Sequence, residues 1–370
     1  FDDAGVRVER ILLDLVRPDP VQPRRVLPER IYHEFHANRM TPSQALRELV
    51  QIAQLAARQQ GRPFKGVLEL LGNPDDENEA DPPALSPEEA LLRDLVNLAV
   101  TIRDDGQVNP LTVVDVTQGV TRQYRIETGE RRYWATWLLR DFIPAYEGDG
   151  MVPCVVIPAE QSTPFRQAKE NTARTGLSAV AMARQAALLL LFVHGYDIPD
   201  GAVPNDFYRQ ALELDLRGKR EYTEAVLSAM GGVTKQRFNQ YKNLLKLSDD
   251  AIELADRHRL DEYVLRPVLQ LSFEAQAEMI QHIIQFALTG RQVRDIVERE
   301  INDEDADASD QQAAPHIRSF VKSMQRVSDD DLQEFIRGLL MQERTKEMAR
   351  ARVESTIAFL TRITEQLSDG

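Results

Sequence analysis

Cysteine is nearly absent from this sequence, since Cys154 is the only one in 370 residues. A disulfide within the chain and a zinc or iron–sulfur site built from several cysteines are therefore excluded. No apolar run approaches the ~20 residues that a membrane-spanning helix needs. The first residues also lack the charged and then apolar pattern of a signal peptide. We therefore expect a cytoplasmic protein that makes no contact with a membrane.

Positive charge is also in deficit, with 45 Lys and Arg against 59 Asp and Glu and a formal net charge of −14. This balance argues against a protein that coats nucleic acid indiscriminately. Much of the acidity lies in residues 72–85 and 302–315, which hold few apolar residues and are predicted to be loops or linkers. Residues 217–246 have the opposite balance, an excess of five positive charges. A DNA-binding segment is therefore compatible with the acidity of the whole chain.

The spacing of apolar residues predicts an α+β fold that is mostly helical overall. Short apolar runs predict strands over residues 8–16, 111–116, 123–127 and 152–157. Helical spacing and capping residues predict helices over 41–60 and 87–105 and one that begins near Arg131. Almost everything after residue 165 is predicted to be helical.

These elements predict three domains and one linker. A mixed domain occupies residues 1–165 and contains a helical insertion at about 38–85, and a helical domain occupies 166–301. The linker 302–315 then leads to a helical hairpin over 316–370. The hairpin has an apolar face that it is too small to bury by itself, which favours docking on a second copy and hence a homodimer.

The first candidate site is Gly129-Glu130-Arg131-Arg132, where a predicted strand changes into a helix. Glycine lets the backbone approach a ligand closely, and the first N–H groups of a helix attract anions. The two arginines add donors that can bind phosphate through two hydrogen bonds. The four residues suit a di- or triphosphate, although a helix start with surface arginines explains them equally well.

The second candidate site lies in residues 169–174. The side chains of Glu170 and Asn171 offer oxygen ligands of the kind that Mg²⁺ prefers, and Arg174 could reach a phosphate. Taken alone, this short segment just before the next apolar helix favours a solvated helix start over a ligand site.

The third candidate site is a helix-turn-helix over about residues 222–247. Its turn contains Gly231 and Gly232, and Thr234 caps the second helix and is placed among the DNA-contacting residues. The outer face of that helix carries side chains that can hydrogen-bond base edges in a major groove: Lys235, Gln236, Arg237, Asn239, Gln240 and Asn243. Lys242 is expected to contact DNA phosphates. An ordinary helical hairpin with a basic face remains the alternative.

The motifs, in this order, resemble those of the ParB family of chromosome and plasmid partition proteins over roughly residues 8–300. Residues 17–24 (RPDPVQPR) resemble the family's N-P-x-Q-P-R box, and residues 106–111 (GQVNPL) resemble its G-x-x-Q-P-x segment. Residues 129–135 match the G-E-R-R-x-x-A motif, and residues 170–174 resemble E-N-x-Q-R. The helix-turn-helix follows as it does in the family.

The resemblance implies a ParB/sulfiredoxin-like N-terminal domain and a DNA clamp that depends on CTP and Mg²⁺ and hydrolyses CTP slowly. The helix-turn-helix would recognise a specific palindromic, centromere-like site on double-stranded DNA. The nucleotide-binding residues would be Gln22, Arg24, Gly106, Asn109, Gly129, Glu130, Arg131, Arg132, Asn171 and Arg174. Glu170 and Asn171 would hold the metal ion, and Glu170 would be the catalytic residue. The protein would associate with the nucleoid or with a plasmid.

The sequence also departs from the family pattern. Asn109 and Ala173 stand where the family has Gln, and about sixty residues, instead of a short spacer, separate the first two motifs. The basic peptide that stimulates a ParA-type ATPase is not evident before Val8, so a ParA partner stays open. Two other functions stay open as well. One is a DNA-binding transcriptional regulator of this fold without a working nucleotide switch. The other is an enzyme of the sulfiredoxin or free-serine-kinase branch, which lacks the helix-turn-helix.

Overall fold

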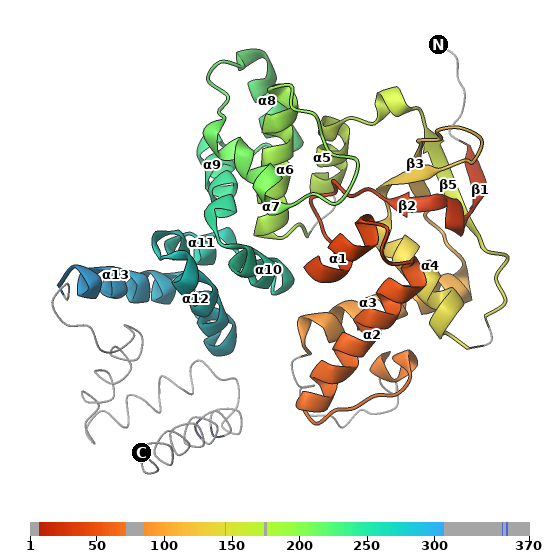
Figure 1. Cartoon of the computed structure of the whole chain (residues 1–370), viewed down its shortest axis with the longest axis horizontal. Helices are drawn as coiled ribbons and strands as arrows, with labels where there is room; N and C mark the ends of the chain where they lie inside the picture. Colours follow the sequence, from red (N-terminus) through yellow and green to blue (C-terminus); the bar gives the residue numbers. More distant parts are fainter. Residues whose placement is uncertain are drawn as a thin grey trace. The chain divides into compact units, whose positions relative to one another are not determined.

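The computed structural model describes residues 7–71, 85–144, 146–173 and 176–306, and also residues 350 and 353. Contacts divide the chain into two units, Phe1–Val297 and Glu298–Gly370. The candidate sites lie in the first unit, which is mixed α and β and mostly helical, as predicted (Figure 1). No helix in these described segments is both long and apolar enough to cross a membrane.

The described strands form one sheet of five in the order β1-β5-β3-β4-β2. The pairs β1/β5 and β3/β4 are antiparallel, whereas β3/β5 and β2/β4 are parallel. The strands are β1 Val8–Leu12, β2 Val16–Pro18, β3 Leu111–Asp115, β4 Tyr124–Thr128 and β5 Met151–Ile157. The last three confirm predicted strands to within one or two residues.

The single strand predicted over residues 8–16 was wrong, because a 3-10 turn at Leu13–Leu15 divides it into β1 and β2. The two strands nevertheless lie at opposite edges of the sheet. Four Cα steps, from Leu12 to Val16, span at most about 14 Å, whereas four strand spacings in a flat sheet would need about 19 Å. The sheet must therefore curl until its two edges approach each other.

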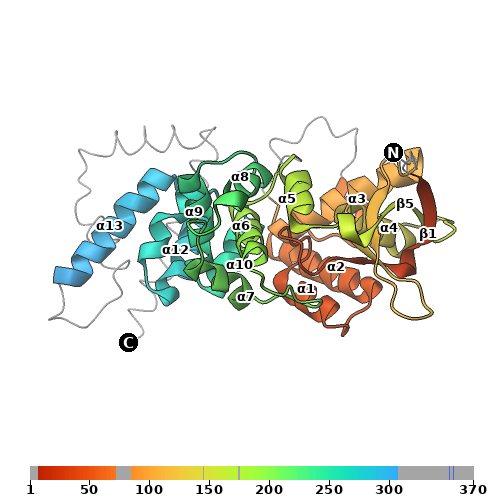
Figure 2. The same cartoon turned by 90° about the horizontal axis from the view of Figure 1, so that it is seen from above.

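Four helices build the core of the mixed part together with the sheet: α1 Glu29–His36, α2 Pro42–Gln59, α3 Pro87–Asp105 and α4 Glu130–Phe142. Tyr133, Trp134 and Leu138 of α4 are buried in this core, and α4 packs against both α2 and α3. Figure 2 shows α2, α3 and α4 gathered beside the strands. The core fixes the start of α4 against the ends of β3 and β4, and the first candidate site lies there.

The helices α2 and α3 begin at the predicted residues. Each starts with a capping box, Thr41 with Gln44 and Ser86 with Glu89, and each has proline at its first position. The apolar face of α2 is fully buried in the common core. The predicted insertion therefore enlarges this core instead of forming a core of its own.

The helical part of the first unit is built around α6 Ala179–Val193, which is buried on nearly every side. This burial explains why its sequence is almost continuously apolar. The other helices are α5 Pro164–Ala173, α7 Asn205–Arg209, α8 Arg220–Ala229, α9 Lys235–Asn243, α10 Asp249–Arg257, α11 Glu262–Leu265, α12 Phe273–Phe286 and α13 Gly290–Ala306. Glu170 and Asn171 precede the apolar helix α6, as predicted, but they lie within α5, a separate helix that was not predicted. Proline at the first position of α5 starts this extra helix.

Several predicted segments fall outside the described residues. The acidic loop at 72–85 does so almost entirely, as does the hairpin at 316–370, with its predicted dimer contact, apart from two single residues. The predicted linker at 302–315 begins inside α13, which runs to Ala306. The predicted boundary between domains at residue 165 stays a prediction.

Candidate functional site

The first candidate site is a tight turn from β4 into α4. Gly129 has a φ of 104°, which L side chains rarely adopt. A Cβ atom there would come within 2.6 Å of Cδ2 of Leu111 and 3.2 Å of Cζ of Arg132. Glycine is therefore required both by the backbone conformation and by the close neighbours. The turn leaves the first N–H groups of α4 at the edge of an open pocket.

This pocket encloses about 440 Å³ and is lined by several separate stretches of the chain. The segment after β2, the turn between β4 and α4, and helix α5 each contribute to it. Eight of the predicted nucleotide-site residues lie on its wall: Gln22, Arg24, Asn109, Gly129, Glu130, Arg131, Arg132 and Asn171. Residues that are up to 149 positions apart in the sequence therefore meet around one cavity.

A chain of hydrogen bonds joins the motifs across the pocket. Asn171 donates from Nδ2 to Oε1 of Gln22 at 3.3 Å, and Gln22 donates from Nε2 to the backbone carbonyl of Glu127 at 2.8 Å. Gln22 is buried, so both ends of its amide are held by protein partners. These bonds fix α5 to the strand that precedes the Gly129 turn.

The two adjacent arginines of the turn both have protein partners. Arg131 forms an ion pair with Asp94 of α3 at 2.9 Å. Arg132 donates from Nη1 to the backbone carbonyl of Asn109 at 2.6 Å and also to that of Pro110. These two hydrogen bonds from Arg132 hold the loop that leads into β3, and Asn109 takes part through its main chain.

Glu130 has an unusual protonation equilibrium for a glutamate in the first turn of a helix. Removal from water raises its pKa to about 7, although Trp134 donates from Nε1 to its Oε1 at 3.0 Å and opposes that rise. The raised pKa favours the neutral form of this carboxyl group, which reduces its repulsion of an anion in the pocket.

Arg24 reaches the pocket from the segment between β2 and α1. It donates from Nη2 to the carbonyl of Gly176 at 2.5 Å. Burial lowers the pKa of Arg24, and the guanidinium groups of Arg259 and Arg131 lower it further. A cluster of positive charge therefore faces the cavity beside the Gly129 turn.

Glu127 is a pocket residue that the sequence analysis missed. Its side chain is fully buried, and within the described residues its carboxylate lies close to the side chains of Arg166 and Ser162. Arg166 lies 3.6 Å from Oε2, and burial raises the pKa of this carboxyl group. The available signal was a carboxylate at the end of a predicted strand, directly before the predicted phosphate turn.

Magnesium is usually held by one or two carboxylates together with substrate phosphates. No group of three His, Cys, Asp or Glu side chains in the described part of the chain is arranged to hold a metal ion. Asp19, Glu127 and Asn171 line the pocket, whereas Glu170 is absent from its wall. A metal ion that arrives with a phosphate would fit this donor set, because the phosphates would complete its coordination.

Two predicted nucleotide residues are not on the wall. Gly106 ends α3 with a φ of 77°, and a Cβ atom added there would have no other atom within 4 Å, so Gly106 acts as a helix terminator. Arg174 lies outside the described residues.

The predicted helix-turn-helix is present as α8, a turn at Gly231 and Gly232, and α9. Thr234 caps α9 by accepting a hydrogen bond from the backbone N–H of Arg237 at 3.2 Å. Lys235, Gln236 and Asn239 are exposed on α9, and Gln240 and Asn243 are partly exposed. These polar side chains form an outward face like the one predicted.

Two members of the predicted DNA face have other contacts. Lys242 is buried and donates to the carbonyls of Leu212 at 3.2 Å and Leu214 at 2.7 Å, so its predicted place on the phosphate-contacting surface was wrong. Burial lowers its pKa. Arg237 forms an ion pair with the buried Glu262 and lies 4.8 Å from the ring centroid of Tyr241.

The fold and these sites define a protein with a mixed α/β domain, a polar pocket at a strand-to-helix turn, and a helix-turn-helix. No family model matches the chain. The probable chromosome-partitioning protein ParB of Vibrio cholerae serotype O1 is 26% identical over 210 residues, which are 56% of this chain and 59% of that protein. The chain is therefore similar in sequence to a ParB protein, and it spans less than two thirds of that protein's length.

Two solved structures are similar to the chain, both of C-terminally truncated chromosome-partitioning protein ParB from Caulobacter crescentus. The one complexed to the centromeric parS site is 16% identical, has a TM-score of 0.29, and covers 61% of this chain and 93% of its own. The one complexed with CTP-gamma-S is 20% identical, has a TM-score of 0.18, and covers 59% of this chain and 97% of its own. These TM-scores are too low to transfer a site or a partner.

Proposed function

We propose that this chain is a DNA-partition protein whose helix-turn-helix binds a specific palindromic site on double-stranded DNA and whose pocket binds CTP with Mg²⁺. It acts as a homodimer that closes around DNA when nucleotide and site are both bound, and it hydrolyses CTP slowly. The observation that carries this proposal is the single pocket around which eight predicted nucleotide residues meet.

The chemistry of the pocket favours a polyphosphate. The backbone N–H groups at the start of α4 bind phosphate oxygens, and the required glycine at position 129 lets the phosphates approach the backbone. Arg24 and Arg131 supply positive charge, and the raised pKa of Glu130 limits opposing negative charge. These residues orient the phosphates and exclude water from one side of them.

A magnesium ion bound with the nucleotide would neutralise charge on the phosphates. Asn171 and Glu127 line the pocket and are the side chains that would hold it there. Glu170 remains the proposed residue for hydrolysis, since it lies one residue before Asn171 on α5, next to Glu127. A carboxylate there can orient a water molecule towards a phosphate.

The DNA contact is proposed for the exposed face of α9. Asn and Gln side chains can each form two hydrogen bonds with adenine, and Lys contributes contacts with guanine or phosphate. Association with the nucleoid or a plasmid follows from this binding. Arg237 would have to break its ion pair with Glu262 to reach a base, and the loss of that ion pair would reduce the binding free energy it contributes.

Titration of the full chain with CTP, ATP, GTP and UTP, each with and without Mg²⁺ and with and without site DNA, tests the proposal. We expect CTP to bind most tightly. Arg132→Ala should abolish CTP binding, because the two hydrogen bonds that hold the loop at Asn109 and Pro110 are lost. The same variant should leave site-specific DNA binding nearly unchanged. Arg122→Ala, which removes an exposed arginine from the loop between β3 and β4, is the control for loss of one positive charge. Failure of every nucleotide to bind would overturn the proposal.

A second function is favoured by one observation. Arg131 and Arg132 already have protein partners, an arrangement that also suits a DNA-binding regulator of this fold without a nucleotide switch. The same titration separates the two functions. The regulator binds its DNA site with unchanged affinity whether or not CTP is present.

A further inference from the structure

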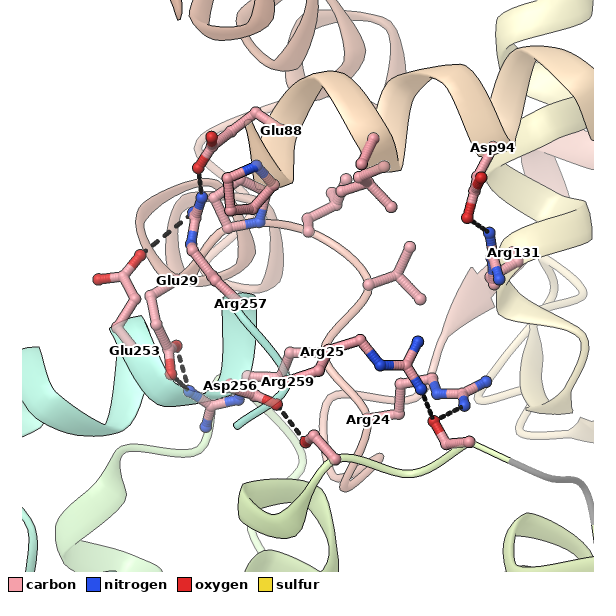
Figure 3. A pocket seen from close by; sticks show the side chains of 18 residues that line it. Arg24, Arg25, Glu29, Glu88, Asp94, Arg131, Glu253, Asp256, Arg257 and Arg259 are labelled. Carbon is pink, nitrogen blue, oxygen red and sulfur yellow. Dashed lines mark hydrogen bonds and ion pairs between the residues drawn. The ribbon is translucent and has the colours of Figure 1, made fainter. Parts of the chain in front are cut away.

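A second cavity, of about 220 Å³, lies beside the pocket and shares Arg24, Val26, Asp94 and Arg131 with it. Its far wall comes from the helical part of the unit, through the end of α10 and the residues that follow it. Figure 3 shows this cavity with the side chains that line it. The nucleotide pocket therefore adjoins a second cavity that residues of the helical part help to enclose.

The carboxylates of this second cavity are neutralised by arginines. Arg257 pairs with Glu88 and lies 3.2 Å from Glu253, and Arg184 pairs with Asp256 at 2.5 Å. Glu29 pairs with Arg25 and with Arg184, and Asp94 with Arg131. Each carboxylate of the cavity wall therefore has at least one arginine partner.

Arg24 and Arg259 form no ion pair within the described segments, although both line the cavity. Each donates from Nη2 to the same acceptor, the carbonyl of Gly176, at 2.5 Å. Two guanidinium groups thus share one neutral oxygen, as the dashed lines in Figure 3 show. Such sharing leaves several donors of each guanidinium and both positive charges for an anion.

The backbone at Arg259 gives an independent indication. Helix α10 ends with a Schellman-type cap, in which Leu260 donates to the carbonyl of Ala255 at 3.0 Å and Arg259 to that of Asp256 at 3.2 Å. Arg259 has a φ of 52°, the left-handed conformation that glycine adopts most easily at this position. Arginine here costs folding free energy, which is typical of a residue retained for binding.

We propose that Arg259 is a phosphate-binding residue, and that with Arg24 it holds the terminal phosphate of a nucleoside triphosphate whose remainder lies in the neighbouring pocket. The inference rests on the proposed function and deepens it. The terminal phosphate would connect the first motif, through Arg24, with the residue that directly follows α10. The helical part would therefore contact the nucleotide only when the third phosphate is present.

The variant Arg259→Gly tests the inference, because glycine fits the left-handed cap while the guanidinium is lost. We expect its thermal midpoint to be no lower than that of the unaltered chain. Calorimetric titration should show CTP bound about 10- to 100-fold more weakly, the range for losing a charge-assisted hydrogen bond, whereas CMP affinity stays unchanged. Arg291→Gly, at an exposed position on α13, is the control for loss of one positive charge.

An unchanged preference for CTP over CDP and CMP in Arg259→Gly would overturn the inference, and so would a lowered thermal midpoint with unchanged binding. If the unaltered chain binds no nucleotide, the proposed function fails. Titration with inorganic triphosphate then tests the phosphate-binding role of Arg259 by itself. Triphosphate binding that is lost in Arg259→Gly supports the inference. No binding, or equal binding by both proteins, contradicts it.

Discussion

Asn171 donates a hydrogen bond from its side-chain amide to the side-chain oxygen of Gln22, across 149 positions of the sequence. Gln22 in turn holds the backbone of β4 through Glu127. The two motifs therefore act as one unit at the pocket, and each side chain fixes the orientation of the other.

Asn171→Ala should weaken CTP binding about tenfold, since the loss of one hydrogen bond and the freed orientation of Gln22 cost about 1–1.5 kcal/mol. Calorimetric titration measures this change. Asn239→Ala, on the DNA-binding face of α9, should leave CTP affinity as it is. If Asn171→Ala bound CTP normally, α5 would have no part in the site.

Gly129→Ala should lower the free energy of unfolding by about 1–3 kcal/mol, because the methyl group enters a left-handed backbone and meets Leu111. Urea denaturation checks this value. Gly119→Ala is a closely matched control, since Gly119 also has a positive φ, 90°, but has open space around it. The destabilisation beyond that of the control measures the close approach, and equal losses would show that only the backbone conformation matters.

Acidification should stabilise the chain through Glu130. Its pKa is raised in the folded state to about 7, against 4.5 for the ordinary group. Between these two values the folded state binds more protons than the unfolded state, so the free energy of unfolding falls as the pH rises from about 4.5 to about 7. Glu130→Gln removes this contribution and keeps an acceptor for Trp134.

The fluorescence of Trp134 offers a direct measurement of that titration, because its indole N–H donates to the titrating carboxylate. We expect a transition near pH 7 that disappears in Glu130→Gln. A transition that persists in this variant would assign the titration to another group.

Lys242→Ala should lower the free energy of unfolding by about 1–3 kcal/mol, because the buried carbonyls of Leu212 and Leu214 lose their donor. Lys235→Ala, at an exposed position, should leave stability unchanged. It should weaken binding to specific and random duplexes alike and reduce the salt dependence by about one counterion. Electrophoretic mobility shifts at several salt concentrations distinguish the two variants. Equal stability of both would contradict the buried role of Lys242.

Asn239→Ala should weaken binding to the specific site by about 1–3 kcal/mol and binding to random DNA very little, because an amide on the exposed face of α9 reads a base edge. The ratio of the two dissociation constants is the measurement. A uniform loss on both duplexes would place Asn239 on the DNA backbone.

The sequence predicts most helices and strands because their signals are local. Ser86 with Glu89 marks the start of α3, and the Gly129 turn marks the change from β4 to α4. The exposure of Lys242 was mispredicted because a long side chain can fold back over its own helix to carbonyls of another segment. Glu127 and Arg259 were missed because their importance depends on neighbours that are distant in the sequence.

The two edge strands of the curled sheet have a consequence for the order of folding. Both come from residues 8–18, which the ribosome makes before the other strands, yet β2 pairs with β4 and β1 with β5, whose last residue is Ile157. Strand β1 must therefore wait, without its backbone partner, for roughly 140 residues of further synthesis. Long-range pairing of this kind slows folding and leaves unpaired strands open to aggregation. The mixed domain should consequently acquire its stability only after β5 has left the ribosome.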